Sequence, residues 1–302
     1  MTVEESGKGL GLKTSCRLLG YTRQAYYKQR RRVEHRAIGV ELILQEVVRI
    51  RMSQNRVGVR KLHHMMGPFT REHGVEMGRD ALCDLLREHS MLIRRRRRRG
   101  PRTTFSCFWK QCYPNLAKDF TPVASNQLWV SDITYIRIRE GFGYLSLITD
   151  AYSRKIVGYH LRGDLTAKGP AAALRMALRS NPDREGLIHH SDRGLQYYSS
   201  QYMKLIGRNI RISMTEHSDP LENAIAERVN GILKQELLAK NFSSLSEATR
   251  QVEQAVSIYN HLRPHLSIDM LTPAEAHAQT GPLTKRWKNY YSANNFLSQA
   301  MA

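Results

Sequence analysis

Apolar and polar residues follow two different periods along the chain. In the first 90 residues, apolar positions recur three and four apart, which is the spacing of amphipathic helices. Gly20 separates the first two of these helices and Thr22 is placed to cap the second, an arrangement typical of a helix-turn-helix. The helices are predicted within residues 10–29 (two short helices) and at 38–52, 57–66 and 79–89.

The pattern changes after residue 126. Three strands come first, with Gly141 and Gly143 at the turn between the first two, and helices and strands alternate from there on. This order predicts an α/β layer arrangement with a mixed sheet. The strands are predicted at residues 128–138, 143–149, 155–161, 187–190 and 210–214, and the helices at 167–179, 200–206, 220–238 and 246–262.

These patterns divide the chain into five segments. Two helical units precede a stretch without clear periodicity, which we interpret as a linker, and an α/β domain and a short tail follow. The predicted segments are a helix-turn-helix at 1–35, a second helical unit at 36–99, a basic linker at 100–125, the α/β domain at 126–280 and a C-terminal tail at 281–302.

Positive charge is concentrated in the helical part. The chain has 47 Lys and Arg against 27 Asp and Glu, a net charge of +20, and residues 1–120 hold 26 of these basic residues but only 11 of the acidic ones. Basic domains gain affinity for nucleic acid because phosphate contacts release counterions. Both helical units are therefore predicted to bind DNA, with a membrane surface or an acidic protein as the competing partner. The predicted DNA contacts in this part are Arg17, Arg23, Lys28, Arg94, Arg95, Arg96, Arg97, Arg98 and Arg99.

Composition excludes several other classes of protein. No stretch approaches the about 18 consecutive apolar residues of a membrane span, and residues 1–13 lack the apolar segment of a signal peptide. Four cysteines in 302 residues do not form a disulfide framework. We therefore expect a cytoplasmic protein without a membrane partner.

A carboxylate interrupts the apolar row of the first predicted strand. Even-numbered residues from Leu128 to Ile138 share one face of that strand, and Asp132 lies among them. Because an unpaired buried carboxylate is costly, Asp132 is expected to be paired, hydrogen-bonded or bound to a metal ion. An aspartate held by a neighbouring arginine is the structural alternative.

A second carboxylate, Asp192, lies just beyond the predicted strand at 187–190. Ligand sites in open α/β sheets collect at the carboxyl ends of strands, so this position favours a functional role. His189 and His190 precede it. Imidazole suits zinc better than magnesium, and both histidines are interpreted as core or supporting residues.

A third acidic residue, Glu227, lies on the predicted helix at 220–238. Asn223, Asn230 and Lys234 share its face, which lies opposite the apolar stripe of that helix. Taken alone, this face is better explained as an ordinary solvated helix surface, where most such Glu and Lys residues lie.

Together, the three carboxylates resemble the D-D-E core of retroviral integrases and transposases. Further motifs resemble, more closely, insertion-sequence transposases of the IS-three family. These motifs span residues 127 to 277, and a looser similarity to the family's second-frame product covers CRLLG at 16–20 and the tyrosines at 26–27. The motifs are WVSDITYI at 129–136, YLS at 144–146, DAYSR at 150–154, IVG at 156–158, HSDRGLQY at 190–197, NAIAE at 223–227, YN at 259–260, RPH at 263–265 and LTPAE at 271–275.

The resemblance implies a ribonuclease H-like integrase catalytic core at 126–280. It implies that Asp132, Asp192 and Glu227 are the catalytic residues and jointly bind two Mg²⁺ or Mn²⁺ ions. Such hard cations prefer oxygen ligands, and a pair of them can activate the attacking oxygen and stabilise the leaving oxygen in phosphoryl transfer. Lys234 is expected to hold a DNA phosphate near the metals.

Two acidic residues are alternatives to members of this set. Asp150 ends the second predicted strand, but its neighbours form a turn, where aspartates usually bond local backbone. Glu222 competes with Glu227 but lies off the shared helix face. The interval between Asp192 and Glu227 holds 34 residues, one fewer than is typical of the family, which a loop absorbs. We therefore prefer Asp132 and Glu227.

Two weaker patterns are left open or set aside. A zinc site built from two cysteines and two histidines does not fit the usual ligand spacing. Arginine and histidine in the RPH motif are compatible with contacting DNA or with capping the last helix. The residues concerned are Cys107, Cys112, His63, His64, Arg263 and His265.

The sequence thus predicts a prokaryotic, nucleoid-associated DNA transposase, a D-D-E polynucleotidyl transferase that binds the terminal inverted repeats of an insertion sequence and cuts and joins its ends. Its expected partners are double-stranded DNA and further copies of the chain on DNA, and the family resemblance leaves open whether the chain acts alone or fused by frameshifting to an upstream-frame DNA-binding protein. A DNA-binding regulator with an inactive integrase-like domain is the first alternative. A ribonuclease H-like nuclease acting on RNA is the second, and the predicted helix-turn-helix argues against it.

Overall fold

A single helix, α2, extends across the boundary between the two helical units that the hydrophobic pattern predicts as separate. The computed structural model describes residues 12–93, 113–118, 120–139, 141–182, 185–216 and 223–284. Its helical part consists of α1 (Leu12–Leu18), α2 (Arg23–Ser53), α3 (Val59–Glu72) and α4 (Arg79–Glu88).

The predicted N-cap of α2 is confirmed, but the predicted end of that helix is wrong. The Thr22 hydroxyl accepts a hydrogen bond from the Ala25 amide at 3.1 Å, and α2 then continues without a break to Ser53. Residues 38–52 therefore form no separate helix, and the predicted boundary at 35/36 lies inside α2. The part of α2 between residues 29 and 38 lies outside the apolar core. Good helix formers stabilise it, as does the ion pair between Arg30 and Glu34, which lie one turn apart with an N–O distance of 3.0 Å.

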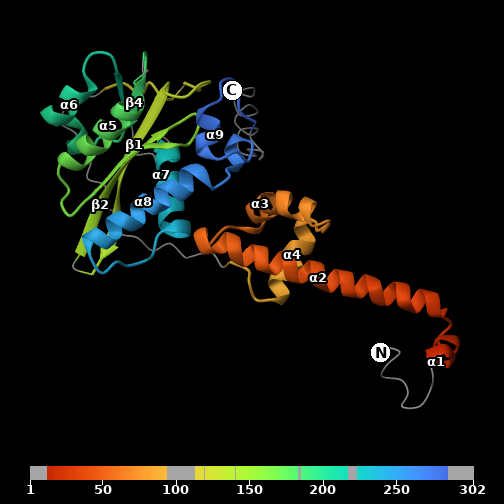
Figure 1. Ribbon diagram of the computed structural model, residues 1–302. Coiled ribbons are helices and arrows are strands. Elements are labelled where there is room, and N and C mark those ends of the chain that lie inside the picture. The colour runs from red at the N-terminus through yellow and green to blue at the C-terminus, as the bar shows by residue number, and fades with distance from the viewer. Residues whose placement is uncertain are drawn as a thin grey trace, which may run out of the picture.

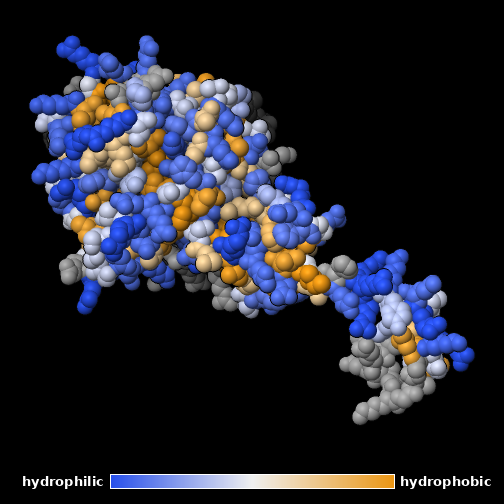
Figure 2. All heavy atoms as spheres, in the orientation of Figure 1, coloured by the Kyte–Doolittle hydropathy of each residue, from blue (hydrophilic) through white to orange (hydrophobic). Residues whose placement is uncertain are grey.

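The main apolar core of the helical part lies at one end of α2. The C-terminal half of α2 packs against α3 and α4, whereas α1 lies at the far end of α2, away from the rest of the molecule (Figure 1). Figure 2 shows that this far end is mostly hydrophilic on the face in view. The buried core of the bundle consists of Ile43, Val47, Ile50, Val57, Leu62, Met66, Leu82, Leu85 and Leu86.

The second part is the predicted α/β domain with a mixed sheet. Its strands are β1 (Leu128–Ile138), β2 (Gly141–Asp150), β3 (Ile156–Arg162), β4 (Ile188–Ser191) and β5 (Arg211–Met214). Its helices are α5 (Lys168–Ser180), α6 (Ser200–Ile206), α7 (Ala224–Ile232), α8 (Leu245–His261) and α9 (Pro273–His277), with 3-10 helices η1 (Leu195–Tyr198) and η4 (Leu266–Ile268) and a π-helical segment η3 (Leu233–Leu237).

The five strands follow the order β3-β2-β1-β4-β5. The first three form an antiparallel meander, and β4 and β5 run parallel to β1. Helices cover both faces. Trp129 and Val157 pack against α5 and α6 on one face, while Ile136 and Leu147 pack against α7 and α8 on the other (Figure 1). The predicted three-strand meander followed by alternating helices and strands is confirmed.

The predicted hairpin turn does not include Gly141 or Gly143. Ile138 pairs with Gly141, so both glycines belong to β2 and Gly143 lies inside that strand. A Cβ atom at Gly143 would come within 3.0 Å of the Ile138 and Leu161 side chains, which explains a glycine there by close packing rather than by turn geometry.

The helical part contacts the α/β domain near the start of α3. The Gln54 side-chain amide donates to the Leu262 carbonyl at 2.9 Å, and Lys61 Nζ lies 3.8 Å from Glu236 Oε2. Among the helices in the described ranges, none combines the length and apolarity needed to cross a membrane.

Candidate active site

Strand register brings the first two predicted carboxylates together. Strands β1 and β4 run parallel, and their last pair in register is Ser131 with Ser191. Asp132 and Asp192 each come one residue after this pair, so they lie side by side where β4 ends. This is the edge at which α/β sheets form ligand sites.

Helix α7 covers this edge and holds Asp132 in place. Asp132 lies on the even-numbered face of β1, and its Oδ2 accepts a hydrogen bond of 2.6 Å from the side-chain amide of Asn230. Its Oδ1 accepts from the Ile133 amide at 2.9 Å. Asn223, at the N-terminus of α7, donates to the Ser131 carbonyl at 3.0 Å and so fixes the same helix to the same strand.

Asp192 is held by the turn that follows β4. Its Oδ1 accepts from the Gly194 amide at 3.1 Å, which leaves Oδ2 unused by the described residues. Arg193, next to it, donates to the Thr215 carbonyl at 2.7 Å and does not form an ion pair with either aspartate. The arginine partner considered for Asp132 is therefore not supplied by this neighbour.

The third carboxylate has a different setting. Glu227 lies in the first turn of α7, is exposed, and makes no hydrogen bond or ion pair within the described part of the chain. Lys234, at the start of the π-helical segment, donates to the Thr134 hydroxyl at 3.1 Å, two residues along β1 from Asp132. Glu227 and Lys234 thus border the aspartate pair from one helix.

The surroundings of the aspartates disfavour negative charge. Burial, together with the charges of Asp192 and Glu227, raises the pKa of Asp132 to about 7 against the opposing hydrogen bonds from Ile133 and Asn230. Burial also raises the pKa of Asp192, opposed by the Gly194 amide. Two adjacent carboxylates without a cationic partner are the arrangement that a bound cation would stabilise.

The donor set fits hard divalent cations. Asp132 and Asp192 present carboxylate oxygens at one edge, and Asn230 and Asn223 each keep a buried side-chain oxygen that accepts no hydrogen bond from the described residues. Within the described ranges, however, no three His, Cys, Asp or Glu side chains are grouped closely enough to form a complete metal site. The structure therefore pairs the two aspartates, while Glu227 is near enough for its charge to act on Asp132 but is not grouped with the pair.

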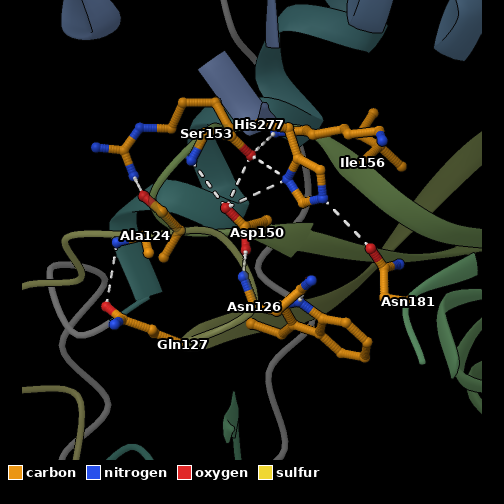
Figure 3. Close-up of polar contacts among 12 residues, drawn as sticks. Ala124, Asn126, Gln127, Asp150, Ser153, Ile156, Asn181 and His277 are labelled. Carbon is orange, nitrogen blue, oxygen red and sulfur yellow. Dashed lines mark hydrogen bonds and ion pairs between the residues drawn. The ribbon is translucent and has the colours of Figure 1, made fainter. Parts of the chain in front are cut away.

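Asp150, the alternative first carboxylate, belongs to a buried structural network (Figure 3). Its Oδ1 accepts from the amide and the hydroxyl of Ser153, both at 2.8 Å, and its Oδ2 accepts from the Asn126 amide at 2.7 Å. The Ser153 hydroxyl also contacts His277 Nδ1 at 3.0 Å, which ties α9 to the end of β2. With its oxygens occupied and the side chain fully buried, Asp150 is not available to a substrate.

Replacing Asp150 by asparagine should destabilise the protein without removing chemistry. The new amide group would face backbone N–H donors, so we expect the free energy of unfolding to fall by about 2–4 kcal/mol. Chemical denaturation measures this change. DNA cleavage per folded molecule at low temperature should stay within about threefold of wild type; a complete loss in folded protein would instead make Asp150 catalytic.

The remaining predicted residues lie elsewhere. Arg17 on α1 and Arg23 and Lys28 in the N-terminal part of α2 are exposed, and these elements lie far from the sheet that carries the aspartates (Figure 1). His189 and His190 are buried beneath the site, where they contact the Tyr202 and Ser213 hydroxyls at 2.9 and 2.8 Å, and burial lowers the pKa of His189 to about 4. Several predicted positions lie outside the described residues, namely Arg94 to Arg99, Cys107, Cys112 and Glu222.

Asn223 and Asn230 are the residues whose roles sequence reasoning missed. Their spacing from Glu227 placed them on its helix face, which was compatible with solvent exposure. Both are buried instead, and both bond to β1 beside Asp132. Two asparagines on a polar helix face were the available signal, since amides that are buried need partners.

Comparison with known proteins identifies the family. Two models of an integrase core domain match residues 122–220 and 208–273. A 31 kDa protein of insertion element IS600 from Shigella sonnei is 33% identical over 265 residues, which cover 86% of this chain and 96% of that protein. The chain belongs to the insertion-sequence transposase family. Its sheet order and integrase core match confirm the predicted ribonuclease H-like fold, and such a core is a polynucleotidyl transferase.

Other relatives and structures extend this comparison. The transposase InsF of IS3A from Escherichia coli K12 is 28% identical over 284 residues, covering 90% of this chain and 96% of that protein. A putative transposase of IS986/IS6110 from Mycobacterium tuberculosis is 32% identical over 167 residues, covering 53% and 60%. The HTLV-2 integrase catalytic core, solved in complex with magnesium, is 18% identical with a TM-score of 0.41 and covers 52% of this chain and 99% of that one.

Proposed function

We propose that this transposase binds the terminal inverted repeats of its insertion sequence and catalyses cleavage and strand transfer at the edge of β1 and β4. The observation that carries this proposal is the half-buried Asp132–Asp192 pair beneath α7, in a chain whose family is built on an integrase core. Adjacent carboxylates with raised pKa values and no cationic partner are typical of functional sites.

Each residue of the site has a proposed task. Asp132 and Asp192 would bind the metal ions that contact the reacting phosphate. Glu227, exposed on α7, would supply the third carboxylate ligand. Two Mg²⁺ or Mn²⁺ ions bound there supply polarisation of the attacking oxygen and stabilisation of the leaving one. Asn230 positions Asp132 through its 2.6 Å hydrogen bond, and Lys234 contacts a DNA phosphate next to the reacting one.

The helical part serves DNA binding in this proposal. Exposed Arg17, Arg23 and Lys28 contact the element ends at the far end of α2, and the α3–α4 bundle forms the second DNA-binding unit. Because transposition joins two ends, the chain acts as an oligomer on DNA in the bacterial cytoplasm. An upstream-frame fusion would add a further DNA-binding segment.

A cleavage assay tests the proposal directly. Oligonucleotide duplexes that carry the inverted repeats flanking the gene should be nicked and joined in Mg²⁺ or Mn²⁺, and a chelator should reduce the rate to background. Duplexes with scrambled ends are the control. If the wild-type protein binds the ends but cleaves nothing in any divalent metal, the chain acts as a DNA-binding regulator and our proposal is wrong.

A further inference from the structure

A cavity with basic walls lies where α3 meets the α/β domain. It has a volume of about 410 Å³ and is lined by α3, α7, the end of α8 and the RPH motif. We call it the basic cavity and define it by Lys61, Arg154, Arg228, Tyr259, Arg263 and His265. Arg263 and His265 are buried here, so the RPH motif lines this cavity instead of an exposed surface.

Positive charge in the basic cavity exceeds the negative charge that contacts it. Arg263 forms a bidentate ion pair with Glu236, with N–O distances of 2.8 to 3.0 Å. Lys61 reaches the same carboxylate only at 3.8 Å. Arg228 makes no hydrogen bond or ion pair with any described residue. Glu236 therefore contacts only two of the four lysine and arginine side chains that line the cavity.

These cations disturb one another. Burial, together with the charges of Arg263 and Arg228, lowers the pKa of Lys61 to about 7 against the opposing effect of Glu236. Burial and the same neighbouring cations lower the pKa of His265 well below its usual range. An anion bound in the cavity would relieve this repulsion.

A buried hydroxyl in the cavity has no partner. Tyr259 is fully buried, lines the cavity, and its hydroxyl makes no hydrogen bond with any described residue. Its ring packs edge-on against His265 with centroids 4.8 Å apart, which fixes its orientation. A buried hydroxyl without a partner is costly, so this one is explained if it donates to a bound ligand.

We propose that the basic cavity is a second phosphate-binding site, which takes a backbone phosphate of the DNA that occupies the active site. Arginine, lysine and tyrosine donors around a cavity that is open to solvent, with Arg228 exposed, match a phosphate group. Arg228 follows Glu227 directly in α7, and Lys61 belongs to the basic helical part. A DNA strand that occupies the active site can therefore also contact Arg228 and Lys61. This inference rests on the proposed DNA substrate.

Replacing Arg228 by glutamine tests the charge contribution. Binding of a fluorescent inverted-repeat duplex to the full-length protein is measured without divalent metal at several salt concentrations. The R228Q variant should bind about tenfold more weakly, and its slope of log affinity against log salt should fall by about one. The matched control is R250Q, which removes an exposed arginine from α8 outside the cavity. Equal affinity and slope for R228Q, R250Q and wild type would overturn the proposal.

Replacing Tyr259 by phenylalanine separates binding from folding. Removing only the unpartnered hydroxyl should leave the melting temperature of the free protein unchanged or higher, while DNA affinity falls about three- to tenfold. If Y259F binds DNA with the same affinity as the wild type, the proposal is wrong. Because no cleavage is measured, failure of the proposed nicking activity leaves these results interpretable.

Inorganic phosphate serves as the second probe. If millimolar phosphate raises the melting temperature of the wild type but not of R228Q or Y259F, and both variants bind DNA as tightly as wild type, the cavity takes free phosphate and our assignment to DNA is wrong. Weaker DNA binding by both variants, together with loss of the phosphate effect, supports it.

Discussion

The Asp132→Asn variant should be folded and inactive. We expect its rates of nicking and of strand transfer to fall about a thousandfold or more, because a neutral amide cannot replace the carboxylate beside Asp192 as a metal ligand. Asp192→Asn and Glu227→Gln should have effects of the same order. Gel assays on inverted-repeat duplexes with saturating Mg²⁺ or Mn²⁺ measure these rates.

The free protein should tolerate Asp132→Asn well. The pKa of Asp132 is about 7, so at pH 8 the folded state carries a charge that its surroundings disfavour, and the neutral amide removes that cost. The buried oxygen of Asn230 accepts no hydrogen bond from the described residues and can accept one from the new amide if the Asn230 side chain turns over. The melting temperature without metal should therefore equal or exceed that of wild type.

Metal binding gives the complementary readout. Mg²⁺ or Mn²⁺ should raise the melting temperature of the wild type. The rise should be much smaller for Asp132→Asn, because a ligand stabilises only the state that binds it. Asp164→Asn, which changes an exposed aspartate after β3, is the control and should behave as wild type. Cleavage by Asp132→Asn within tenfold of wild type would show that the assigned site is wrong.

Gly158→Ala should unfold the protein or destabilise it by about 3 kcal/mol or more. A Cβ atom at Gly158 would lie 2.2 Å from the Ala173 carbonyl oxygen and 3.0 Å from the Ala177 Cβ atom. The nearest obstacle is the backbone of α5, which cannot move aside as a side chain can. Strand β3 and α5 would have to separate and would open part of the core on that face of the sheet.

Gly163→Ala is the matched control for this prediction. Gly163 follows β3 directly, and a Cβ atom there would meet the Leu245 side chain at an ordinary 3.6 Å. Urea unfolding curves of both variants should differ by about 3 kcal/mol in extrapolated stability. A loss of less than about 1 kcal/mol in Gly158→Ala would mean that β3 and α5 do not approach each other this closely.

Sequence reasoning succeeded where local pattern and local structure agree. Alternation from Leu128 to Ile138 matched β1 residue for residue, and the Thr22 cap formed as expected. It failed between residues 29 and 38, because polar residues with high helix propensity continue a helix even where no apolar face requires one. It also placed Gly143 in the hairpin turn, whereas Gly143 lies inside β2, where close packing against Leu161 of β3 explains why the residue is a glycine.

The sequence by itself determined the family motifs, the order of three carboxylates and the mixed sheet that carries them, since these depend on residue types and on periods of two and 3.6. Only the tertiary structure decided which groups meet. Parallel pairing of β1 with β4 places Asp132 beside Asp192, packing of α7 buries Asn230 against Asp132, and docking of α3 brings Lys61 to Arg263. The physical reason is that such contacts join residues far apart in the chain, whereas periodicity reports only which face of its own element a side chain occupies.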